Sequence, residues 1–339
     1  GPSCVLHCRL PLSSLDLPTR PRALINQQLE TREAMSQALR QFRTTTKREA
    51  AHGDNIWAAT WCQGDLITGS LDGSVKLWTV SNSFDIGLKY TSSKQKVGVC
   101  SVATVQDGSL AAVCYQDSVI RLIDLISKQE VASIDPGLFE AYSICFSPAD
   151  DVLVSGNNRG GINVWTMQDG HEKVATLETD NKQVLSTDFS IDGKLASAGI
   201  DGVLNVFDMT SQSITHKIEA HALPIRSIAF SPEGDLLYTS SDDRHANVYD
   251  VRSGSLINSF SHGGMAFSVD ASPDHRHFAV GCADYSVSLW DLGMQKRVSK
   301  FSTHTDQVWG VSFDKSDPSG SRLASVGDDA AIQLYEFTV

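Results

Sequence analysis

Short runs of alternating apolar and polar residues repeat along the chain, and turn-forming residues bound each run. The clearest set of four runs covers residues 225–230, 236–240, 246–251 and 255–260. The connectors between them are rich in Ser, Pro, Asp and Gly, as at residues 231–234. Alternation of this kind, carried by β-branched and aromatic residues, predicts four short antiparallel strands in this unit.

The same four-run unit recurs along most of the chain. An Asp lies six positions before a closing aromatic residue in five of the units, as Asp72 lies before Trp78. The closing positions are 78, 123, 165, 207, 249, 290 and 335, which are 41 to 45 residues apart. Four strands at this period correspond to one blade of a β-propeller, so the pattern predicts an all-β chain with seven blades.

The units resemble the WD repeat, whose hallmark is a His, a Ser or Thr, an Asp and a closing Trp. Three units carry this set or close variants: His52, Thr68, Asp72 and Trp78; His221, Thr239, Asp243 and Tyr249; and His304, Ser325, Asp329 and Tyr335. In the sixth unit Val280 replaces the hydroxyl residue. The resemblance implies a seven-bladed WD-repeat β-propeller over residues 42–339, with each set forming a chain of structural hydrogen bonds inside its blade.

The two ends of the chain raise the question of ring closure. The last unit contains only three predicted strands, whereas residues 42–48, before the first unit, are rich in β-branched Thr. We expect this segment to be the missing outer strand that closes the ring. Residues 1–41 form an N-terminal extension, predicted to be irregular and then, from Asn26, a short helix. A helix packed on the propeller, a partner-binding helix and a partly disordered tail stay open as alternatives.

The repeated His, Ser and Asp residues do not indicate a hydrolase. A catalytic nucleophile requires one activated copy at a pocket, whereas this set recurs in several units. The sequence also contains no phosphate-binding loop, no His-Glu-x-x-His and no Gly-x-Ser-x-Gly motif. We therefore expect no enzymatic activity, no catalytic residues, no cofactor and no metal site.

Composition narrows the class of partner. The chain has 40 acidic residues against 28 Lys and Arg, a formal net charge of −12. Direct nucleic-acid binding is not expected, because neutralising phosphates requires clustered cations.

No apolar run reaches the ~18 residues of a membrane helix. The seven cysteines are scattered and odd in number, which favours reduced, packed thiols over disulfides. We expect a monomeric propeller within larger protein assemblies.

One position of the repeat is predicted to surround the mouth of the central channel. It lies five residues after the His position and holds Trp57, Cys100, Tyr142, Leu185, Arg226, Phe267 and Trp309. The loops predicted on the same face contribute Asp54, Asp180, Asp242, Asp306 and Asp328. An apolar patch with a polar rim marks an interaction site. We expect it to bind a peptide that offers a hydrophobic anchor and an Arg or Lys. The alternative is that some of the rings fold inward and plug the channel.

Several short stretches narrow the resemblance further. Residues 221–227 with 230–232, 306–311 with 325–329, 54–57 and 200–202 are similar to the WD-repeat subunits of the Ski (superkiller) complex. That resemblance implies a non-catalytic scaffold, present in cytoplasm and nucleus. Its implied partners are a tetratricopeptide subunit and a helicase that support exosome-dependent 3′-to-5′ mRNA decay and, in animals, subunits of the nuclear Paf complex in transcription elongation. The alternative is a substrate-receptor propeller of a ubiquitin ligase or another WD-repeat adaptor.

Overall fold

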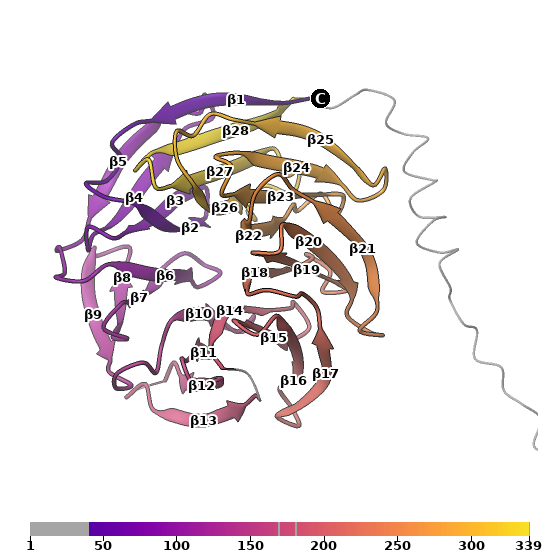
Figure 1. The fold of residues 1–339 in the computed structure, drawn as a ribbon. Coiled ribbons are helices and arrows are strands. Elements are labelled where there is room, and N and C mark those ends of the chain that lie inside the picture. The colour runs from indigo at the N-terminus through magenta and orange to yellow at the C-terminus, as the bar shows by residue number, and fades with distance from the viewer. Residues whose placement is uncertain (1–40, 169, 180–181, 339) are drawn as a thin grey trace, which may run out of the picture. The chain divides into compact units, whose positions relative to one another are not determined.

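The described part of the chain forms seven four-stranded antiparallel sheets arranged as blades around a central axis (Figure 1). The computed structural model describes residues 41–338 except 169, 180 and 181, and every regular element among them is a β-strand. The seven-bladed propeller expected from the repeat is therefore confirmed. None of the described residues forms a helix that could cross a membrane. The predicted irregular and helical segment, up to residue 40, lies outside the described residues.

In each blade the first strand lies beside the axis and the fourth lies at the outer rim. The first four blades are β2 (Ile56–Cys62), β3 (Asp65–Ser70), β4 (Val75–Val80) and β5 (Ile86–Thr91); β6 (Val99–Thr104), β7 (Leu110–Tyr115), β8 (Ile120–Asp124) and β9 (Gln129–Ile134); β10 (Ser143–Phe146), β11 (Val152–Gly156), β12 (Gly161–Thr166) and β13 (Lys173–Glu178); and β14 (Val184–Phe189), β15 (Lys194–Gly199), β16 (Val203–Asp208) and β17 (Ser213–Glu219).

The remaining blades follow the same order, except that the last takes its outer strand from the start of the chain. They are β18 (Ile225–Phe230), β19 (Leu236–Ser241), β20 (His245–Asp250) and β21 (Leu256–Ser261); β22 (Ala266–Ala271), β23 (His277–Cys282), β24 (Val287–Asp291) and β25 (Lys296–Phe301); and β26 (Val308–Phe313), β27 (Arg322–Gly327) and β28 (Ile332–Thr338) with β1 (Gln41–Arg48).

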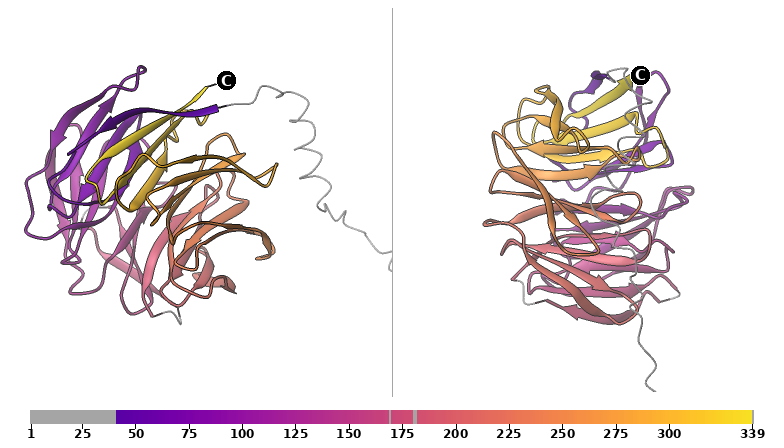
Figure 2. Two further views of the ribbon diagram at one scale, coloured as in Figure 1. Left: turned by 45° about the horizontal axis from the view of Figure 1, so that its top comes forward. Right: turned by 90° about the vertical axis from the view of Figure 1, so that its right-hand side faces the viewer.

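Strand β1 closes the ring by pairing antiparallel with β28. Phe42 lies opposite Phe337, and Arg48 lies opposite Ile332. The Arg43 guanidinium donates to the Glu336 carboxylate at 2.6 Å. Both views of Figure 2 show the indigo first strand beside the yellow last strand. The ring-closing role expected for residues 42–48 is confirmed.

Serine hydroxyls on the inner strands link most neighbouring blades around the axis. In five blades the residue at the middle of the inner strand is a Ser, and its Oγ accepts a backbone N–H from the next blade. The bonds run from Ile144 to Ser101 (3.3 Å), Thr187 to Ser143 (2.9 Å), Ile228 to Ser186 (3.1 Å), Val269 to Ser227 (3.3 Å) and Val311 to Ser268 (3.0 Å). Ala58 and Gly310 stand at the equivalent positions of the first and seventh blades, so those two joints lack this bond.

The hydrogen-bonded sets inside the blades differ in detail from the repeat pattern. In the first blade Trp78 donates to Thr68 at 2.8 Å, and Thr68 lies 2.7 Å from Nε2 of His52. Ser74 donates its one hydroxyl proton to Asp72 at 2.6 Å, so its oxygen accepts from Nδ1–H of His52 at 3.1 Å. The other ring nitrogen of the neutral His52, Nε2, therefore accepts from the Thr68 hydroxyl. Ser74 is therefore a member of the chain that the repeat pattern does not show.

The fifth and seventh blades show two further outcomes. In the seventh, His304 bonds both Asp329 at 2.9 Å and Ser325 at 2.7 Å, and Ser325 bonds the Tyr335 hydroxyl. In the fifth, His221 bonds Asp243 at 2.8 Å and Thr239 at 2.7 Å. The Tyr249 hydroxyl instead donates to the carbonyl of Ala220 at 3.0 Å, so Tyr249 is not a member of that chain.

Deleting residues 42–48 removes the outer strand of the seventh blade and exposes the edge of β28. We expect thermal unfolding of this variant to begin at lower temperature and to be broader than in the parent, as followed by circular dichroism. An unchanged melting curve would falsify the closing role of β1.

Val280 interrupts the set of the sixth blade, where His262 Nε2 and Trp290 Nε1 are buried without a hydrogen-bond partner. Val280→Thr supplies a hydroxyl of nearly the same shape, and we expect it to raise the free energy of unfolding by about 1 kcal/mol. The matched control is Thr68→Val in the first blade, which should lower it by about 2 kcal/mol because it creates the same defect. Chemical denaturation measures the free energy of unfolding of both variants. If both substitutions raised it, or both lowered it, this account would be contradicted.

Buried histidines predict acid sensitivity. Burial lowers the pKa of His262 to about 4 from its usual 6.5. Between these two pKa values the unfolded chain therefore binds more protons than the folded chain. The free energy of unfolding has its full value above pH 6.5 and falls as the pH falls towards 4. Between pH 7 and pH 5 the parent should lose about 2 kcal/mol more than a His262→Gln variant. Denaturant titrations at both pH values measure this difference, and parallel losses in the two proteins would contradict it.

Candidate functional site

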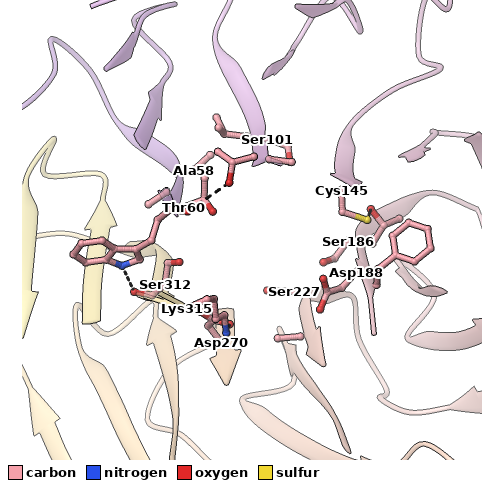
Figure 3. Close-up of a pocket in the computed structure, with 18 of the residues that line it drawn as sticks. Ala58, Thr60, Ser101, Cys145, Ser186, Asp188, Ser227, Asp270, Ser312 and Lys315 are labelled. Carbon is pink, nitrogen blue, oxygen red and sulfur yellow. Dashed lines mark hydrogen bonds and ion pairs between the residues drawn. The ribbon is translucent and has the colours of Figure 1, made fainter. Parts of the chain in front are cut away.

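A cavity of about 850 Å³ lies along the axis and is lined by the inner strands of all seven blades. Figure 3 shows short polar side chains, among them Ser186 and Ser227, lining it with Asp188 and Asp270. Side chains alternate along a strand, so the third and fifth inner-strand positions share one side, and both contribute rings of residues to the cavity wall. The second position contributes a further ring. The ring at the second position is the one predicted to form the channel mouth.

A β-bulge in six of the blades presents this ring. In those blades the strand register shifts between the first and third residues of the inner strand, so the residue between them has no opposite partner. These bulged residues are Trp57, Cys100, Leu185, Arg226, Phe267 and Trp309. In the third blade Tyr142 directly precedes β10 and donates its N–H to Gly156. A bulge re-aims a side chain, which is how these residues leave the ladder and reach the cavity.

Three aromatic rings from consecutive blades form one cluster, which we call the aromatic mouth: Trp57, Phe267 and Trp309. The Phe267 and Trp309 rings stack with centroids 4.3 Å apart and planes 8° apart. The Trp57 and Trp309 rings lie 5.3 Å apart at 34°. Two members of the ring are buried rather than part of an exposed patch, since Phe267 is 6% exposed and Leu185 is 8% exposed. Stacking beneath Trp309 buries Phe267.

Asp328 lies against the two indoles of the mouth. Burial raises the pKa of this carboxyl above its usual range, the Trp309 and Trp57 indole N–H groups offset part of the rise, and the charge of Asp306 adds to it. The side chains of Trp57, Trp309 and Asn55 therefore face this carboxyl, although Trp57 Nε1, Trp309 Nε1 and Asp328 Oδ1 form no hydrogen bond of normal geometry. The carboxylate adds negative charge beside the indole rings of the mouth.

Arg226 and Asp242 form an ion pair within the same ring. The Arg226 guanidinium donates through Nε at 2.9 Å and through Nη2 at 2.7 Å to the two carboxylate oxygens of Asp242. This pairing raises the pKa of Arg226. Asp242 is therefore already neutralised within the chain, whereas Asp306 and Asp328 have no cationic partner among the interactions of the described residues. Asp54 is exposed, and Asp180 lies outside the described residues.

Sequence reasoning missed the two aspartates at the far ring of the cavity. Asp188 accepts the N–H of Phe230 at 2.7 Å, and Asp270 accepts the N–H of Phe313 at 2.7 Å. Each bond crosses to the next blade, so these carboxylates help to join blades. Burial raises the pKa of Asp188 to about 6. Their place at the fifth residue of an inner strand was the available signal, because that position faces the axis.

Cys100 also lines the cavity. Burial raises the pKa of Cys100 to about 12, so its thiol stays protonated at neutral pH. The described residues contain no group of three or more His, Cys, Asp and Glu side chains placed to hold a metal ion. What the mouth offers is aromatic surface beside two carboxylates, which suits an apolar side chain accompanied by a cation.

Comparisons with known proteins place this geometry in a family context. Residues 43–79, 171–208, 212–250, 254–291 and 295–336 match the family model described as WD domain, G-beta repeat. The WD repeat-containing protein SL1-17 of Schistosoma mansoni is 34% identical over 304 residues, which cover 87% of this chain and 99% of the relative. The WD repeat-containing protein VIP3 of Arabidopsis thaliana is 34% identical over 316 residues, covering 86% and 97%. The meiotic recombination protein rec14 of Schizosaccharomyces pombe is 26% identical over 212 residues, covering 62% and 70%.

Proposed function

The chain belongs to the WD-repeat family, and on that premise we propose that it is a non-catalytic scaffold that binds partner proteins at the aromatic mouth. The observation that carries the proposal is the pair of partly exposed indole rings of Trp57 and Trp309, which line the cavity beside the carboxyls of Asp306 and Asp328. Partly exposed aromatic surface beside carboxylates offers contacts to an apolar side chain and to a cation.

The chemistry of the mouth defines the partner segment. An apolar side chain lies on the exposed part of the Trp57 and Trp309 rings, and an Arg or Lys beside it reaches Asp328 and Asp306. The Arg226–Asp242 pair stays intact and forms part of the polar rim. Aromatic residues at the centre of an interface contribute most of its binding energy, whereas exposed ion pairs at the rim contribute little.

The finer proposal concerns the assembly. Three of the stretches that resemble Ski-complex WD-repeat subunits, residues 54–57, 221–227 and 306–311, contain Trp57, Arg226 and Trp309. The resemblance therefore includes residues of the channel mouth. We propose that the chain holds a tetratricopeptide subunit and a helicase in exosome-dependent mRNA decay, joins Paf-complex subunits in transcription elongation, and acts in both cytoplasm and nucleus.

Affinity purification of the full chain with mass spectrometry tests the assembly. Recovery of a helicase with a tetratricopeptide protein, or of polymerase-associated factors, supports the proposal, and loss of these partners from a Trp309→Ala variant assigns them to the mouth. Recovery of ubiquitin-ligase adaptors in their place would favour the substrate-receptor alternative.

Titration calorimetry with the propeller-binding segment of the tetratricopeptide partner tests the mouth itself. Trp309→Ala removes the ring that contacts both Trp57 and Phe267, so we expect a loss of about 2 kcal/mol, roughly thirtyfold in affinity. Asp306→Ala removes only a rim charge and should cost about 0–1 kcal/mol. Melting temperatures of both variants establish that the propeller is intact. Affinity equal to that of the parent in Trp309→Ala would place the binding site elsewhere.

A further inference from the structure

The outer strands of the blades differ in how they protect their open edges. Charged side chains on an edge strand discourage pairing with another chain. Six of the seven outer strands, β1, β5, β9, β13, β17 and β25, carry at least one Lys, Arg or Glu. The remaining outer strand is β21 of the fifth blade, which has the sequence Leu-Ile-Asn-Ser-Phe-Ser and carries no charged residue. The edge of the fifth blade therefore lacks the charged residues that every other blade carries there, and it keeps only a β-bulge at Ile257.

Strand β21 also combines exposed apolar residues with a firm attachment to the next blade. Leu256 is 53% exposed and Ile257 is 37% exposed. Phe260, by contrast, is buried, and its ring lies 5.0 Å from those of both Phe278 and Trp290 in the sixth blade. Among the described strands, only β20 pairs with β21, so its other edge has no described partner. A rigid, uncharged edge of this kind is a template for an added strand.

Four cations flank β21 in an otherwise acidic chain. Residues 251–262 and 292–303 contain Arg252, Lys296, Arg297 and Lys300, although the whole chain has a net charge of −12. Lys300 is paired with Asp284 at 2.8 Å, and Asp250 lies at the turn before β21, where it accepts from Ser253. Arg252, Lys296 and Arg297 are therefore the cations left for a partner. Arg297 lies over the Trp290 ring at 5.8 Å, the ring that Phe260 contacts, which places this cation close to β21. Arg252 and Lys296 are exposed.

We propose that the free edge of β21 binds an extended acidic segment of a partner protein as an added β-strand. Backbone hydrogen bonds to β21 supply affinity, and Leu256 and Ile257 offer apolar contacts to side chains of the added strand. Carboxylates of the partner meet Arg252, Lys296 and Arg297. This surface uses none of the residues of the aromatic mouth, so the failure of one proposal would leave the other unaffected.

Charge complementarity favours such a partner over the two alternatives within this protein. Residues 1–40 contain five Arg against three acidic residues, so this segment is repelled by the cations around β21. A second copy of the chain would bring an identical set of cations to the same edge. An acidic strand is attracted, and the attraction weakens as salt is added.

The test uses the full chain and a fluorescent synthetic peptide in which glutamate alternates with valine and isoleucine. We expect saturable binding by fluorescence anisotropy at low salt, with slower amide hydrogen exchange in residues 256–261 and no change in β13. Ile257→Asp places a repelling charge on the edge and should weaken binding by about tenfold or more. Val174→Asp in β13 is the matched control, since Val174 is equally an exposed apolar residue of an outer strand, and it should bind as the parent does.

Two further peptides separate strand addition from other modes. A peptide with alternate backbone nitrogens methylated keeps its charge but cannot complete the ladder, so it should not bind. A peptide with lysine in place of glutamate should bind at least about tenfold more weakly. Equal binding by the methylated peptide, equal weakening by Val174→Asp, or no saturable binding of the acidic peptide would each overturn the proposal. Peptide-independent dimerisation abolished by Ile257→Asp would assign the edge to a second copy and likewise overturn it.

Discussion

The antiparallel pairing of β1 with β28 is the constraint on which the rest of the molecule depends. Each blade buries its faces only against its two neighbours, so an open ring would leave two blade faces and one sheet edge unpaired. The closing ladder joins residues more than 280 positions apart, from Arg48 opposite Ile332 to Gln41 opposite Thr338. Phe42 extends this closure into the core, where it is buried against the ring of His277.

Once the ring is closed, the inner strands converge on the axis, and short polar residues there become links between blades. The serine series from Ser101 to Ser268 satisfies backbone N–H groups that the ladders leave unpaired. Asp188 and Asp270 do the same one ring further along the cavity. The joints on either side of the first blade lack the serine bond, and Trp61 compensates at one of them by donating to the carbonyl of Ser312 at 2.8 Å.

Unpaired polar atoms have different meanings in two parts of the fold. In the sixth blade, His262 Nε2 and Trp290 Nε1 lack partners because Val280 supplies no hydroxyl, so the defect lies inside a blade where no partner can reach it. At the mouth, the indole N–H groups of Trp57 and Trp309 face the Asp328 carboxyl and offset part of the rise in its pKa that burial causes. The defect in the sixth blade therefore lowers stability, whereas the polar groups of the mouth partly satisfy one another.

The sequence alone determined the seven blades, their strand content and the closing strand, because a repeat of period 41 to 45 and alternating burial are local patterns. It also identified which residues surround the channel mouth. Only the tertiary structure decided how those residues behave. The bulges, the stacking that buries Phe267, the pairing of Arg226 with Asp242, and the departure of Tyr249 from its set all depend on contacts between side chains from different strands or blades. Residue type and spacing do not encode such contacts, because each is fixed by packing across segments that meet only when the ring is complete.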